Sequence, residues 1–158
     1  MNTDMTDINC NNRHETEINA AIAKELKNNF FGDDTTCVIY KDGIIFEHTG
    51  GSIAPVADAW FCGDLEDAVV VDKVIGKASA MFMADGNAAY VHGKLISEPA
   101  QRIMEINNMS YSYDEKTPKI INRTGDGLCP MESAVMDTDN LQDGIARVFD
   151  KMNELGML

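Results

Sequence analysis

The feature of this sequence that most constrains its fold is an Asp-Gly pair between two runs of strand-forming residues. Residues 35–40 and 44–48 are rich in Thr, Val and Ile, and Asp42 and Gly43 lie in the gap between them. An Asp-Gly pair accepts the positive φ angles of a tight hairpin turn, and β-branched side chains favour strands. The sequence therefore predicts a β-hairpin at residues 35–48, and with it a sheet.

Helical and strand-like segments follow one another along the chain. At residues 14–30 the apolar residues recur at helical spacing, and Gly32 is typical of a helix stop. Further helices are predicted at residues 53–61, 72–83, 99–107, 131–136 and 141–155. Strands or strand-like segments are predicted at residues 68–71, 87–96, 111–113 and 119–121. This order predicts one layered α/β domain around one sheet.

The length of 158 residues fits a single domain. Residues 1–13 are polar and predict a flexible leader, and residues 14–158, which contain no linker or repeat, predict the domain. The leader has no apolar core of a signal peptide, and no segment approaches the ~18–20 apolar residues of a membrane span. Four cysteines without a C-x-x-C pair are typical of free thiols in a reducing compartment: Cys10, Cys37, Cys62 and Cys129. A cytoplasmic location is therefore expected.

The charge of the chain bears on its partners. Lys and Arg total 13 against 26 Asp and Glu, which gives a net charge of −13. A field of that sign repels phosphate backbones and anionic lipid headgroups, so neither nucleic acid nor a membrane surface is expected as a partner. The charge can also serve solubility alone.

Five phrases carry a resemblance to a known family, and together they cover most of the chain from Thr36 to Met136. They are VIYKDG (38–43), VVDKVIGKA (70–78), ISEPA (96–100), INRTG (121–125) and LCPME (128–132). In these five phrases the chain resembles an uncharacterised family, the domain of unknown function DUF1893, which has a cytidine-deaminase-like fold. The resemblance implies a layered α/β/α domain with one central mixed sheet.

The residues that hold zinc in deaminases of this fold are missing. A zinc deaminase needs a His or Cys followed two residues later by Glu at one helix start, and Pro-Cys-x-x-Cys at the next. No His or Cys occurs between Gly63 and Val91, and Ala100 and Ile103 stand where the two cysteines belong. Hydrocarbon side chains cannot bind zinc. We therefore expect no metal site, no cofactor and no zinc-dependent deamination.

Cys129 is the best single candidate for a catalytic residue. Proline favours the first helical position, so Pro130 makes Cys129 the N-cap of a helix. Unpaired backbone N–H groups and the helix dipole then favour the nucleophilic thiolate. Glu132 could close a capping-box-like contact with this turn. The alternative is that Cys129 is a small, inert side chain in a capped turn.

The turn before Cys129 contains candidate ligand-binding residues. Gly125 and Gly127 would let the backbone approach a ligand, and the turn could form an anion nest. Asn122 and Arg123 could bind a nucleobase or a phosphate. The alternatives are an ordinary glycine-rich connection and a surface ion pair of Arg123.

Lys77 and Asp72 are two further candidates for catalysis. We interpret them as polar residues of an otherwise apolar helix, on different faces because they are five residues apart. Lys77 could orient an anionic ligand as a buried cation or act as an amine of lowered pKa, whereas a solvated lysine is the alternative. Glu98, at the start of the next helix, is a candidate ligand contact.

The leading hypothesis is a deaminase-fold protein without zinc that binds a small ligand, nucleotide-like by analogy, near Lys77, Glu98 and Cys129. Whether the chain is an enzyme stays open. The first alternative is a thiol-dependent enzyme with Cys129 as its nucleophile. The second is a non-catalytic regulatory or interaction module, with homo-oligomers formed through the apolar helix around residues 81–83.

Overall fold

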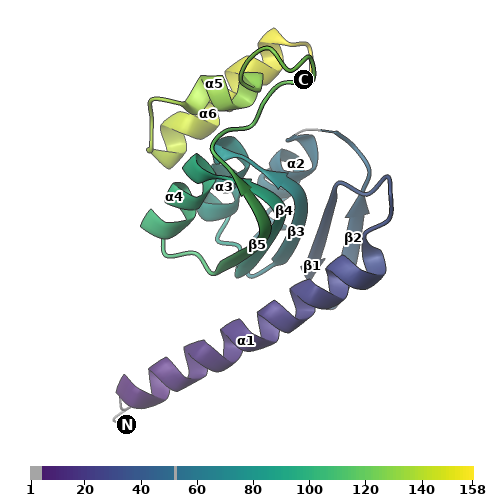
Figure 1. Ribbon diagram of the computed structural model, residues 1–158. Helices are drawn as coiled ribbons and strands as arrows, with labels where there is room; N and C mark the ends of the chain where they lie inside the picture. The colour runs from purple at the N-terminus through teal and green to yellow at the C-terminus, as the bar shows by residue number, and fades with distance from the viewer. Residues whose placement is uncertain (1–4, 52) are drawn as a thin grey trace.

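A five-stranded mixed sheet forms the centre of the molecule (Figure 1). The computed structural model describes residues 5–51 and 53–158, with side chains from residue 13 onward. The sheet has the order β2-β1-β3-β4-β5. Its strands are β1 (Cys37–Lys41), β2 (Ile44–His48), β3 (Val69–Ile75), β4 (Tyr90–Ser97) and β5 (Tyr111–Thr117). The predicted α/β domain with one mixed sheet is confirmed.

The hairpin that opens the sheet forms as the Asp-Gly pair predicts. Strand β1 pairs antiparallel with β2, with Lys41 opposite Ile44. Asp42 and Gly43 have φ angles of 51° and 79°, the left-handed conformation of a tight turn that suits these two residue types. Strand β1 also pairs antiparallel with β3, whereas β3, β4 and β5 run parallel.

Helices cover both faces of the sheet (Figure 1). Helix α1 (Met5–Phe30) lies along one face. The other face carries α2 (Ala54–Cys62), α3 (Lys77–Asp85) and α4 (Glu98–Ile106), and α5 (Pro130–Val135) and α6 (Leu141–Glu154) pack beyond them. The parallel order of β3, β4 and β5 requires crossover connections, and α3 and α4 supply them.

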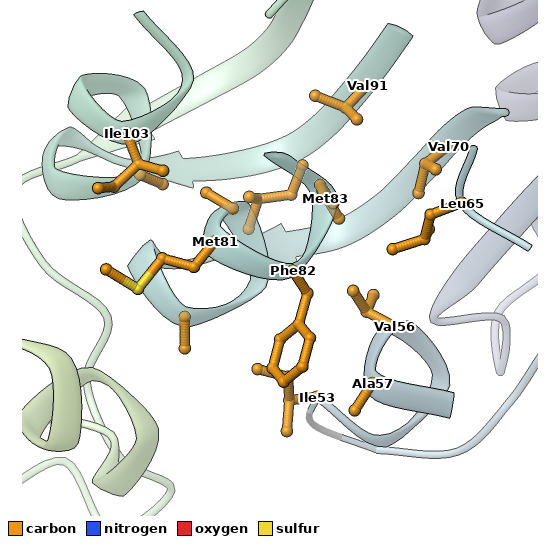
Figure 2. Close-up of a cluster of buried hydrophobic side chains, with 14 of the residues drawn as sticks. Ile53, Val56, Ala57, Leu65, Val70, Met81, Phe82, Met83, Val91 and Ile103 are labelled. Atoms are coloured by element: carbon orange, nitrogen blue, oxygen red, sulfur yellow. The ribbon is translucent and has the colours of Figure 1, made fainter. Parts of the chain in front are cut away.

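The larger hydrophobic core lies between the sheet and the helices that follow it. Phe82 points from α3 toward Ile53 and Ala57 (Figure 2), and Met83 and Val91 belong to the same buried cluster. Phe82 also packs edge-on against Trp60 and Phe149. Met81, Phe82 and Met83 are fully buried, so they cannot form the oligomer surface that the sequence suggested at residues 81–83.

Several element boundaries differ from the prediction, and β5 extends to Thr117 instead of residue 113. Helix α1 begins at Met5, so it includes residues 5–13, although their flexibility and the division of the chain at residue 13 stay predictions. Asp72 belongs to β3, not to a helix, because the β-branched run that contains it extends the strand to Ile75. Residues 119–121 form only an isolated bridge between Ile121 and Leu128.

Candidate functional site

A cleft of about 670 Å³ opens between the end of β3 and the segment that leads into α5. We call it the apolar cleft because hydrocarbon groups make up most of its wall. The polar side chains in its wall include Asp72, Asn122, Arg123, Cys129 and Glu132. The chain between β5 and α5 therefore brings residues 122–132 to the edge of the sheet where β3 ends.

Asp72 is a buried carboxyl group in the wall of the apolar cleft. Side chains alternate along a strand, so Asp72 shares the α3 face of the sheet with Val70, and it pairs in register with Cys37 of β1. Its exposed fraction is 6%. Burial raises the pKa of Asp72 to about 7, although hydrogen bonds from the backbone N–H groups of Val74 and Lys73 partly oppose the rise.

Glu132 is the second buried carboxyl group of the apolar cleft, with an exposed fraction of 9%. It lies in the first turn of α5, but its Oε1 accepts a 3.4 Å hydrogen bond from the backbone N–H of Ala78 in α3. Burial raises the pKa of Glu132, while backbone N–H groups of Ala78 and Lys77 and the Lys77 ammonium oppose the rise. Glu132 therefore accepts from backbone N–H groups at the start of α3. The predicted contact of Glu132 with the Cys129 turn is wrong.

Gly76 is what allows the Glu132 carboxylate to reach α3. Gly76 is the N-cap of α3, and a Cβ added to it would overlap the Glu132 carboxylate. A helix start leaves backbone N–H groups without partners, and a carboxylate there also interacts favourably with the helix dipole. The glycine of the Gly76-Lys77 pair is therefore needed for close packing against Glu132, a residue far along the chain.

Cys129 occupies the N-cap position of α5 as predicted. Its side chain makes no capping hydrogen bond, and the half-buried thiol lies in the wall of the apolar cleft instead. The backbone holds it in place, because its N–H donates to the Ile120 carbonyl at 3.0 Å and its carbonyl accepts from Ser133 N–H at 3.0 Å.

Residues 122–127 form a loop that bonds mainly to itself. Asn122 Nδ2 donates to Asp126 Oδ1 at 2.9 Å, and Thr124 Oγ1 donates to the same oxygen. These side-chain hydrogen bonds from Thr124 and Asn122 lower the pKa of Asp126. Gly125, with φ of 77°, and Gly127 shape the loop but do not line the cleft. The backbone N–H groups of Gly125 and Asp126 donate to oxygens of Asn122, so the loop itself uses donors that an anion nest would offer to a ligand.

Lys77 and Glu98 lie in a different cleft, of about 500 Å³. We call it the ion-pair cleft, and Arg102, Asp137 and Asp139 also line it. The buried Lys77 ammonium lies 3.0 Å from Asp139 Oδ1 and donates to the Met136 carbonyl at 3.3 Å. Lys77 is therefore a buried cation as one alternative proposed, but it does not meet Cys129, and neither does Glu98.

Comparison with known proteins places the chain in a family. A model of the family described as a domain of unknown function (DUF1893) matches residues 25–152. The chain belongs to the DUF1893 family. It is similar to the crystal structure of a DUF1893 family protein (TM1506) from Thermotoga maritima, with a TM-score of 0.72 and 31% identity, over 85% of this chain and 88% of that chain. None of the curated proteins matches it, and neither match assigns a function.

Sequence reasoning missed the role of Glu132 in this DUF1893 protein. The sequence placed Glu132 only at the start of its own helix, and its one other notable feature was that it belongs to the LCPME phrase shared with the family.

Sequence reasoning also missed a second group of polar side chains, which lies under α1. His92 Nδ1 lies 2.7 Å from Ser112 Oγ, and its buried Nε2 lies 3.2 Å from Asp114 without an aligned hydrogen bond. Asp114 also binds Lys27 of α1 at 2.7 Å, so this group ties α1 to the sheet.

No helix among the described residues is both long enough and apolar enough to cross a membrane.

Proposed function

We propose that this DUF1893 protein binds a small, nucleotide-like ligand in the apolar cleft. The observation that carries the proposal is that Asp72, Arg123, Cys129 and Glu132, which come from distant parts of the sequence, line one cleft of about 670 Å³. Small-molecule sites have this size and this mixture of apolar walls with a few polar groups. Titratable side chains whose pKa values are shifted also gather at functional sites.

The nucleotide-like part of the proposal rests on a cytidine-deaminase-like fold. A hairpin, a helix and then a strand that runs straight into a proline-started helix are typical of that fold. Here β1 and β2 form the hairpin, and β4 continues directly into α4, whose second residue is Pro99. The inference from fold to ligand is an analogy, so it needs a direct binding test.

The zinc ion of the deaminases does not fit the residues of this chain. Ala100 and Ile103, at the expected cysteine positions, are fully buried hydrocarbon side chains of the core. Lys77 begins α3 and pairs with Asp139. Across the part of the chain that the structure describes, no three His, Cys, Asp or Glu side chains are grouped to hold a metal ion. The proposed function therefore contains no zinc-dependent step.

Ligand binding can be tested with a panel of nucleosides and nucleoside monophosphates, by calorimetric titration of the full chain. We expect at least one nucleotide to bind and to slow iodoacetamide labelling of Cys129, which lines the cleft, without slowing that of the exposed Cys62. Cys62 is thus an internal control for reagent quality and for unfolding. Failure of the whole panel to bind, or equal protection of both thiols, would contradict the proposal.

A thiol enzyme is the second candidate, because Cys129 places a half-buried sulfur in a cleft with two carboxyl groups. We expect Cys129 to react with iodoacetamide at neutral pH faster than Cys37, since burial raises the pKa of the Cys37 thiol. Cys10 lies outside the residues whose side chains the structure describes. If Cys129 does not react in the folded protein, the thiol mechanism fails, and ligand binding or a regulatory module remains.

A further inference from the structure

The two carboxyl groups of the apolar cleft accept hydrogen bonds from backbone N–H groups and form no ion pair within the described part of the chain. Asp72 and Glu132 are each more than nine-tenths buried, yet neither takes part in an ion pair there. Lys77, which follows the N-cap of α3, extends into the ion-pair cleft and pairs with Asp139. Burial of a carboxylate is costly and raises both pKa values, and the Lys77 ammonium opposes the rise at Glu132 only in part.

Arg123 supplies the opposite charge at another part of the same cleft. It is exposed, and no ion pair or side-chain hydrogen bond of Arg123 occurs among the described residues. Its Nη2 atom would lie 2.9 Å from a Cβ added to Gly51, so the guanidinium crosses from the loop before α5 to the segment after β2. A guanidinium in such a place is suited to bind a carboxylate or phosphate through two hydrogen bonds.

We propose that the apolar cleft selects a bipolar ligand, with a cationic nitrogen group against Asp72 and Glu132 and an anionic group against Arg123. The cationic group is an amidine, a guanidine or an amine, because these offer several N–H donors to carboxylate oxygens. The anionic group is a phosphate or a carboxylate. The inference rests on the proposed function, since it assigns a charge pattern to the ligand of that cleft.

Three small aromatic probes test the cationic end. Benzamidine carries an amidinium, benzamide is its neutral isostere, and 4-amidinobenzoate adds an anion at the far end of the ring. We expect benzamidine to bind at least about tenfold more tightly than benzamide, and D72N and E132Q each to remove most of that preference. Wild-type protein and both probes suffice for the comparison if a variant fails to fold.

Arg123 is tested by the third probe. We expect 4-amidinobenzoate to bind several-fold more tightly than benzamidine, and R123Q to abolish this gain. The matched control is K119Q, which changes the net charge equally at an exposed lysine that does not line the cleft. The gain should survive in K119Q.

Proton release gives a readout that a purely structural role would not produce. Because the pKa of Asp72 is about 7, a bound cation at pH 7 should expel a fraction of a proton, which appears as a dependence of the binding heat on buffer ionisation. Among other ionisable groups, the Cys37 thiol of β1 interacts with this carboxyl, and Lys73 of β3, Arg123 and Glu132 of α5 line the same cleft. Benzamide should release none.

Two outcomes would overturn the inference. The first is equal binding of benzamidine and benzamide, or no binding of any probe up to about 10 mM, a range in which compounds of this size bind well-formed sites. The second is a benzamidine preference that D72N and E132Q leave unchanged. Nucleotide binding in the earlier titration would then still support the proposed function, whereas failure of both experiments would remove both proposals.

Discussion

The apolar cleft and the ion-pair cleft begin at consecutive residues of one helix start, and they treat charge in opposite ways. Gly76 and Ala78 line the apolar cleft, while Lys77 lines the ion-pair cleft. In the ion-pair cleft, Lys77 and Arg102 both bind Asp139, and this holds the pKa of Asp139 below its usual range. In the apolar cleft, Asp72 and Glu132 have raised pKa values.

The difference separates residues that support the fold from residues that cost it stability. Paired charges in the ion-pair cleft satisfy one another. In the apolar cleft, the Asp72 carboxyl group is buried without an ion pair, which lowers stability when the group ionises. Groups that lower stability in this way are characteristic of functional sites. The apolar cleft is therefore the stronger candidate for a functional site.

The largest expected effect is a pH-dependent stabilisation by Asp72→Asn. The pKa of Asp72 is about 7 in the folded chain against 3.8 for an ordinary aspartate, so the folded state binds this proton more tightly. As pH rises from about 4 to about 7, the unfolded chain loses the proton first and the folded state loses up to about 4 kcal/mol of stability. Asparagine cannot ionise, so the variant lacks this loss.

The measurement is urea unfolding of wild type and Asp72→Asn at pH 4 and pH 8. We expect the variant to gain up to about 4 kcal/mol relative to wild type between the two pH values. Subtracting the wild-type curve removes the opposite slope of carboxylates with lowered pKa values, such as Asp139. A difference that does not change with pH would show that Asp72 is not an uncompensated carboxyl group.

Gly76→Ala should have the next largest effect. The added Cβ would overlap the Glu132 carboxylate and force it away from the start of α3. Overpacking of this kind costs about 1–3 kcal/mol, and a lost hydrogen bond adds to it. The control is Gly50→Ala, where the nearest atom to a Cβ is Pro55 Cγ at 4.0 Å. Equal melting temperatures for the two variants would contradict the assigned contact.

Lys77→Met tests how much the ion pair between Lys77 and Asp139 contributes to stability. Methionine keeps the buried hydrocarbon volume but removes the ammonium from Asp139, which keeps Arg102. We expect a loss of about 1–2 kcal/mol in unfolding free energy, since the pair is partly exposed. Lys24→Met, at an exposed lysine of α1, is the stability control.

The smallest expected effect is that of zinc. Added zinc should leave the melting temperature of the wild type unchanged, and metal analysis of purified protein should show no stoichiometric zinc, because Ala100 and Ile103 stand where the proposed deaminase-like fold would need cysteines. One zinc ion per chain that survives dialysis against a chelator would contradict the residue assignment.

Local patterns predicted much of the fold. The hairpin depends on two adjacent turn residues, and the last helix, at Leu141–Glu154, depends on apolar spacing within its own segment. The length of β3 was harder to predict, because a run of Val and Ile around Asp72 suits a buried strand and a buried helix alike. The start of α1 was also missed, since its first residues lack an apolar face.

The sequence by itself determined the α/β architecture, the position of Cys129 at a helix start and the lack of a Pro-Cys-x-x-Cys motif, because each depends on neighbours in the chain. Only the tertiary structure decided that Asp72, Cys129 and Glu132 share one cleft while Lys77 and Glu98 share another. The direction of a side chain at a helix start depends on which distant segment packs there. Here Glu132 folds back over Gly76, and Asp139 binds Lys77 on the other side.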